Sequence, residues 1–111
     1  MSAESTLVFF GIRFDVLPDE IEMLETNNHP HIRKAREFGL NYYGGNFAEP
    51  GEKYFLFIGT KLGVVGAENT AEVRVAPDDL GTIVNETKAK LRRAGFETEP
   101  AFFVQWMPDA Y

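Results

Sequence analysis

The alternation of apolar and polar positions is clearest at the two ends of the chain, and it predicts a strand at each. In residues 6–16 one alternate set of side chains is apolar throughout, while the other set becomes polar at Arg13 and Asp15. A strand with this pattern buries one face completely and the other face in part. Residues 101–107, AFFVQWM, predict a last strand before Pro108.

The middle of the chain predicts several shorter strands joined by turns. Residues 53–59 are apolar on both faces, which is typical of an interior strand, and residues 40–47 form a strand weakened by glycine. Glycine, proline and asparagine mark the breaks between such strands. We therefore expect turns at 48–52, near 60–63 and at 68–69, with further strands at 62–66 and 70–76.

Two regions show the spacing of amphipathic helices. The first begins at Pro18, breaks at His29-Pro30 and ends at Gly39; the second runs over 77–94 and ends at Gly95. Proline suits the first turn of a helix, and glycine suits the position just after its end. Acidic residues crowd both starts, where the positive end of the helix dipole favours them.

The resulting order of elements predicts an α+β fold. We expect a ferredoxin-like split βαβ sandwich with an extra hairpin, whose helices pack on one face of a mostly antiparallel sheet. At 111 residues, the chain has the size of a single domain covering 1–111. Its polar start, residues 1–5, is expected to be a disordered tail.

Composition narrows the possible functions. The chain has no cysteine, which excludes disulfides, thiolate nucleophiles and iron–sulfur clusters and favours a cytoplasmic location. Its net charge of −6 argues against a nucleic-acid partner. No apolar run approaches the length of a membrane span, so we expect no membrane association. No motif indicates a cofactor.

Several polar and aromatic side chains on the predicted strands are candidates for ligand binding. Arg13 and Asp15 lie two residues apart and therefore share a strand face. With side chains from neighbouring strands they predict a small-molecule pocket lined by Arg13, Asp15, Tyr54, Gln105 and Trp106. The alternative is that Arg13 and Asp15 form only an exposed ion pair, which contributes little to stability.

The stretch 41–47 combines aromatic residues with two adjacent glycines. Tyr42 and Tyr43 point to opposite faces of a strand, and Gly44 and Gly45 let another backbone approach. An edge strand of this kind is a natural dimer contact, so we expect Tyr42, Tyr43 and Phe47 at an interface. The alternative is an edge strand with a bulge.

The two histidines of the chain, His29 and His31, are weak candidates for metal binding. In an extended segment their spacing places both rings on one side. The alternative is that His29 caps a helix that begins at Pro30. The basic run 33–36 is interpreted as the solvated face of that helix.

Three functional hypotheses follow from the sequence. The first is a small non-enzymatic binding or interaction module that forms a homodimer, because the chain is rich in Phe and lacks a catalytic constellation. Serine, for example, occurs only at positions 2 and 5. The second is a small-molecule-binding protein or small enzyme that uses the open face of the sheet. The third is an acidic inhibitor of a basic partner protein.

Overall fold

The computed structural model describes residues 5–47, 53–66 and 71–107, and within them the chain forms one antiparallel sheet and three helices. The order of strands across the sheet is β2-β3-β1-β4, and every neighbouring pair is antiparallel. The strands are β1 (Ser5–Asp15), β2 (Asn41–Asn46), β3 (Tyr54–Val65) and β4 (Ala101–Met107). The predicted α+β class and the antiparallel sheet are confirmed.

The helices occupy the two regions that the sequence predicts. The first region holds the short 3-10 helix η1 (Pro18–Glu20), α1 (Ile21–Glu25) and α2 (Pro30–Glu37), and the second holds α3 (Pro77–Arg93). Asn27 takes the left-handed φ of 58° that ends α1, a conformation that Asn tolerates better than most residues. Gly39 and Gly95 follow α2 and α3 with φ of 71° and 87°, as expected for residues that end helices.

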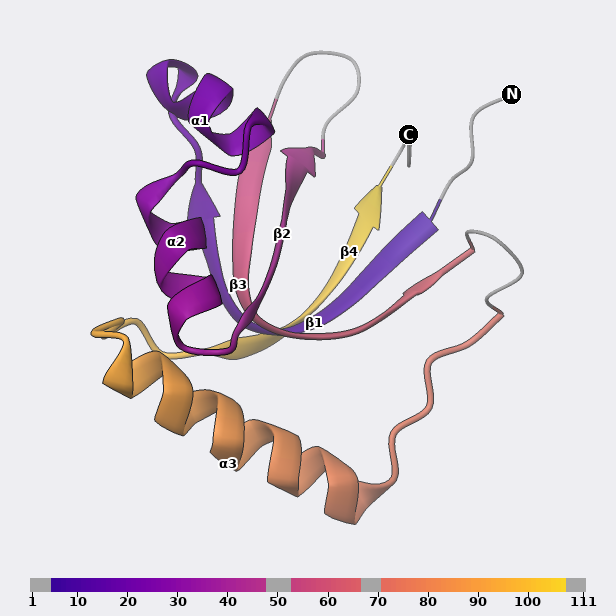
Figure 1. Cartoon of the computed structure of the whole chain (residues 1–111). Helices are drawn as coiled ribbons and strands as arrows, with labels where there is room; N and C mark the ends of the chain where they lie inside the picture. The colour runs from indigo at the N-terminus through magenta and orange to yellow at the C-terminus, as the bar shows by residue number, and fades with distance from the viewer. Residues whose placement is uncertain (1–4, 48–52, 67–70, 108–111) are drawn as a thin grey trace.

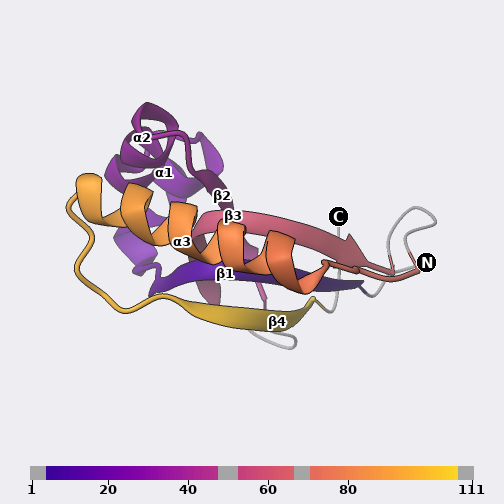
Figure 2. The same ribbon diagram turned by 90° about the horizontal axis from the view of Figure 1, so that it is seen from below.

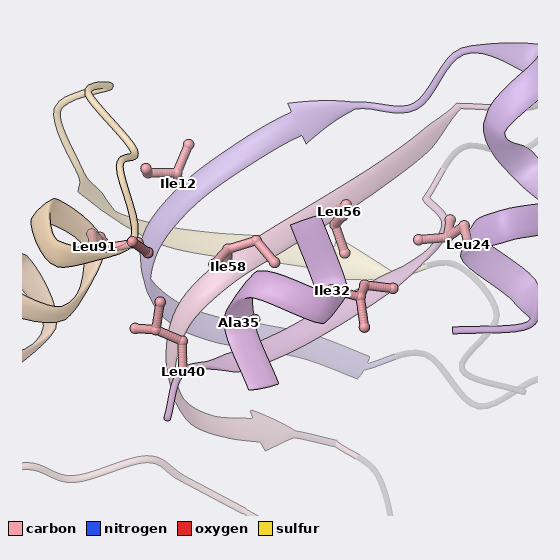
Figure 3. Packing of buried hydrophobic residues seen from close by; sticks show 9 residues of the cluster. Ile12, Leu24, Ile32, Ala35, Leu40, Leu56, Ile58 and Leu91 are labelled. Carbon is pink, nitrogen blue, oxygen red and sulfur yellow. The ribbon is translucent and has the colours of Figure 1, made fainter. Parts of the chain in front are cut away.

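All three helices bury their apolar sides against the same face of the sheet. Figure 3 shows this core, in which Ile12, Leu56 and Ile58 of the sheet meet side chains from each helix. The members from the helices are Leu24, Ile32, Ala35 and Leu91, together with Ala94 directly after α3. Each is at most 6% exposed, so burial of this face supplies much of the hydrophobic stabilisation.

The two central strands are long and strongly bent. Figure 1 shows β1 and β3 curving together, with the helices on the outer side of the bend. Gly11 and Gly59 are paired across the two strands at this point. A Cβ on Gly59 would lie 2.7 Å from the Cα of Gly11, so the backbones approach more closely than any side chain permits. The bend therefore depends on two facing glycines.

The inner side of the bend holds a second core, made mostly of aromatic rings. Phe57 of β3 lies at its centre and contacts Phe9, Phe47 and Phe103, with ring centroids 5.4–5.6 Å apart. Phe103 lies on β4, and Phe47 directly follows β2. On a flat sheet these edge strands would be about 14 Å apart. Because the sheet curls, rings from both edges meet over Phe57, which is fully buried.

The extra hairpin expected before the last helix does not form in the described residues. The turn predicted near 60–63 is wrong, because β3 continues to Val65 and stays paired with β1. The register of the two strands shifts at a bulge opposite Val8 and Phe9, and pairing continues on both sides of this bulge. The strand predicted at 70–76 is also wrong over the described residues 71–76. Val73 there packs over Gly63, and such packing produces the same alternation as strand pairing.

Some predicted features lie outside the described residues. These are the turns at 48–52 and 68–69 and residues 1–4 of the expected tail. Ser5, which the prediction placed in that tail, is buried and begins β1.

Candidate functional site

Arg13 lies on the aromatic side of the sheet and stacks on the rings beneath it. Its guanidinium carbon is 4.4 Å from the centre of the Phe55 ring and 5.2 Å from that of Phe103. Its Nη1 donates a hydrogen bond of 3.1 Å to Oε1 of Gln105. Among the described residues, none supplies a carboxylate that pairs with this guanidinium. Arg13 is thus an exposed cation that stacks on the aromatic rings of Phe55 and Phe103.

The hydrogen bond between Arg13 and Gln105 depends on the bend of the sheet. In the register of β1 with β4, Gln105 stands opposite Leu7. Arg13 is six residues further along β1, or about 20 Å on a straight strand. The two side chains meet because β1 curls toward β4. The pair therefore bridges the inner side of the bend and covers part of the aromatic core.

The remaining residues of the predicted pocket do not join this pair. Asp15 is exposed on β1 and has no ion-pair partner in the part of the chain that is described. Tyr54 packs against the core on the helical side of the sheet. Trp106 is next to Gln105 on β4, and adjacent side chains of a strand point to opposite faces, so Trp106 also faces the helical side. The five candidates thus lie on two opposite faces, and only Arg13 and Gln105 come together.

The aromatic residues expected at an interface serve the protein's own interior. Phe47 is buried in the aromatic core, and Tyr43 packs partly against it. Burial raises the pKa of the Tyr43 hydroxyl above its ordinary value. The hydroxyl of Tyr42 accepts a hydrogen bond of 2.9 Å from Nη2 of Arg36. These contacts explain the aromatic composition of 41–47 without a partner.

The exposed apolar surface lies instead on β4. Phe102, Val104 and Trp106 point to the helical side of the sheet and are 49%, 74% and 51% exposed. The helix α3 packs on β1 and β3, so this part of the sheet stays uncovered. Figure 2 shows β4 on one side of α3 and the helices α1 and α2 on the other. We refer to these three side chains as the β4 stripe.

The outer edge of β4 also lacks the features that usually protect an edge strand. Its sequence, AFFVQWM, contains no charged residue and no proline. Its register with β1 shows no bulge. Natural sheets commonly use charge, proline or a bulge to prevent pairing with other chains. Phe102 and Val104 are not among the residues that the sequence predicts for an interface, although a charge-free strand with Gln105 as its one polar residue is a signal for such a surface.

His29 is held as a structural residue. Its Nδ1 accepts a hydrogen bond of 3.1 Å from the backbone N–H of His31, which caps the start of α2. A nitrogen that accepts carries no proton, so Nε2 carries it and faces Oε2 of Glu20 at 3.4 Å. With both nitrogens engaged and the side chain buried, His29 offers no lone pair for metal binding or general-base chemistry.

His31 lies between two aromatic rings. Its ring stacks on Phe14 at 4.4 Å between centroids and meets the edge of Phe96 at 5.3 Å. Burial lowers the pKa of His31, and its electrostatic interactions with His29 and Lys34 lower this pKa further, while the interaction with Glu20 acts in the opposite direction. His31 is therefore held toward its neutral form.

The basic run on α2 is exposed, as the solvated-face interpretation predicts. Arg33 and Lys34 are both exposed, and Nζ of Lys34 lies 5.5 Å from the centre of the Phe96 ring. A hollow of about 380 Å³ lies between α3 and residues 96–100. Lys88 and Arg92 line it together with Glu97 and Glu99, so charges of both signs face one another there. This mixture of charges favours the binding of neither an anion nor a cation in the hollow.

No group of three or more metal-ligating side chains occurs in 5–47, 53–66 and 71–107. None of the helices described is both long and apolar enough to cross a membrane. Comparison of the chain with models of protein families, with curated proteins and with solved structures gives no match. In the described residues, the β4 stripe and the Arg13–Gln105 pair are therefore the two candidate functional sites.

Proposed function

We propose that this protein is a small non-enzymatic interaction module that forms a homodimer through β4. The observation that carries the proposal is the exposure of the β4 stripe, Phe102, Val104 and Trp106, on a charge-free strand. Contiguous exposed apolar side chains are typical of protein contact sites. Aromatic side chains are also enriched among residues that dominate binding energy.

A second copy of the chain is the partner that this surface suits. The protein carries a net charge of −6, and an uncharged strand is the part of its surface where two copies repel least. The three exposed side chains supply roughly 300 Å² per protomer, if a large side chain buries about 150–250 Å². A standard interface buries about 800 Å² per partner. We therefore expect a weak dimer with a micromolar dissociation constant.

Sedimentation analysis over a concentration series tests this proposal. The unmodified protein should show a monomer–dimer equilibrium between about 5 and 200 μM, as expected for a small interface. Val104→Lys should shift it to monomer, because a charge would enter the apolar contact. Leu17→Lys is the matched control, since Leu17 is also an exposed apolar residue, at 58%, but lies away from β4. A strictly monomeric unmodified protein at 200 μM would refute the proposal.

We also infer that the fold is of the ferredoxin-like kind. The element order, in which α1 and α2 join β1 to β2 and α3 joins β3 to β4, supports this inference. The antiparallel order β2-β3-β1-β4 supports it as well, with β1 and β3 in the centre. A cytoplasmic location stays a prediction from the lack of cysteine.

The stacked Arg13 supports a second candidate function, the binding of a small anionic ligand. Arg13 uses one N–H for Gln105, while a guanidinium has five donors. The rings of Phe55 and Phe103 beneath Arg13 would pack against the ring of an aromatic carboxylate. The carboxylate would then pair with the remaining N–H groups of the guanidinium.

Benzoate is a suitable probe for this site. It should raise the melting temperature of the unmodified protein, and Arg13→Ala should abolish the shift because the pairing cation is gone. Arg74→Ala is the control, since Arg74 is an exposed arginine whose Nη2 lies 3.2 Å from Oε1 of Glu72. An equal benzoate shift in Arg13→Ala would remove this candidate and would leave the dimer proposal untouched.

A further inference from the structure

We propose that two copies pair edge to edge through β4, antiparallel, about a two-fold axis at Val104. The two four-stranded sheets would then join into one. This inference rests on the proposed homodimer and specifies how its two β4 strands meet.

Pairing along the edge gives partners both to the unpaired backbone edge of β4 and to the exposed side chains of the β4 stripe. Within the described chain β4 pairs only with β1, so one side of its backbone has no strand partner. A second strand on that side would accept and donate the remaining ladder hydrogen bonds. Its side chains would also meet the β4 stripe laterally. Packing of the two stripes face to face would bury the rings but leave both backbone edges unpaired.

The position of the axis follows from the spacing of the stripe. Centred on Val104, the pairing places Phe102 opposite Trp106 of the second copy and Val104 opposite itself, so all three side chains have apolar partners. Aromatic pairs at directly opposite positions stabilise antiparallel sheets. Centred on Phe103 instead, the pairing would place Trp106 opposite Pro100, which precedes the strand and has no N–H. Centred on Gln105, it would leave Phe102 opposite Pro108.

A shift that pairs Val104 with Gln105 is excluded by the pleat. In antiparallel strands, directly opposite side chains share a face, and a shift of one residue moves every side chain of one strand to the other face. Val104 lies on the helical side and Gln105 on the aromatic side of the sheet. Such a shift would place the helices of the two copies on opposite faces and would separate the two stripes. Pairing at Val104 keeps both stripes on one face.

The helices leave room for this arrangement. In each copy α3 packs on β1 and β3, and therefore at least one strand inside the edge. Across two adjacent β4 strands, the two α3 helices would be about 14–19 Å apart, between three and four strand spacings. Packed helices approach to about 8–10 Å. The two helices would not collide, and they would flank the joined stripes.

Disulfide trapping tests the position of the axis, because the chain has no cysteine of its own. At a two-fold axis the two Val104 Cα atoms would be about 4.5–5.5 Å apart, which is within the range for a disulfide. Val104→Cys should therefore give covalent dimers under mild oxidation. Phe102→Cys is the matched control: two copies of residue 102 would be about 14 Å apart and should cross-link at least tenfold more slowly. Mixing Phe102→Cys with Trp106→Cys should restore cross-linking.

Two measurements separate this inference from the proposed function. If sedimentation shows a dimer but Phe102→Cys cross-links as fast as Val104→Cys, the dimer stands and the axis at Val104 is refuted. If a sedimenting dimer forms and neither variant cross-links, the dimer stands and the axis at Val104 is likewise refuted. If the unmodified protein is a monomer at 200 μM, both proposals fail together.

Discussion

At the scale of single residues, His29 shows how one buried side chain joins two segments. It caps α2 through Nδ1 and faces Glu20 of η1 through Nε2. The sequence offered both a helix cap and a metal ligand for this residue, and the cap is present. The decision between them depends on which atoms surround each nitrogen, and only the folded chain supplies those atoms.

His29→Ala should lower the free energy of unfolding by about 2–4 kcal/mol, because it removes the cap and leaves a cavity. Asn is among the best capping residues, so His29→Asn should recover about 1 kcal/mol of this loss. Urea unfolding of the three proteins measures both effects. Equal stability of the Ala and Asn variants would show that the cap contributes nothing.

His31 predicts how stability depends on pH. Its pKa is lowered in the folded protein, chiefly by burial, so the unfolded chain binds a proton at higher pH than the folded chain does. The stability that neutral His31 contributes is fully present above its unfolded pKa of 6.5. It is lost as the pH falls from there through the folded pKa.

The unmodified protein should therefore be less stable at pH 5.5 than at pH 7.5, as determined by urea unfolding. His31→Phe keeps a ring between Phe14 and Phe96 but cannot titrate. We expect it to lose less stability over the same interval, since the other ionisable groups are common to both proteins. An equal loss in the two proteins would refute a role for His31.

At the scale of the elements, glycines in β1 and β3 determine the shape of the sheet. The sequence suggested tight turns around Gly59 and Gly63, because glycine most often marks a turn. Both residues instead lie inside β3, with positive φ of 155° and 157°. Glycine is favoured both where a strand bends and where a strand ends in a turn, so its presence alone does not distinguish the two. The long partner strand β1, which pairs with β3 from Thr6 to Asp15, decides between them.

Gly59→Ala should destabilise the protein by about 3 kcal/mol or more, because its Cβ would collide with the backbone of β1 in a conformation unfavourable for alanine. Gly45→Ala is the control on β2, where a Cβ would meet nothing within 4 Å. That substitution should be neutral or stabilising by up to about 1 kcal/mol. Thermal unfolding compares the two variants. Similar losses in both would contradict the bend at Gly11 and Gly59.

At the scale of the whole molecule, the proposed dimer links stability to concentration. If folded protomers associate and unfolded chains do not, the melting temperature rises with protein concentration. We expect this rise for the unmodified protein and not for Val104→Lys. Because each copy carries a charge of −6, the effect should grow between about 20 and 200 mM salt, where repulsion is screened. A melting temperature that is independent of concentration would contradict association.

The sequence by itself determined the secondary elements of the helical regions, the end strands and the α+β class. These follow from local spacing, from proline and glycine at helix ends, and from alternation along strands. Only the tertiary structure decided which face each side chain shares with distant residues. The curl of the sheet joins Arg13 to Gln105, draws Tyr43 and Phe47 inward, and leaves Phe102, Val104 and Trp106 outside. Such neighbours depend on strand order and curvature, which arise from contacts between segments far apart along the chain.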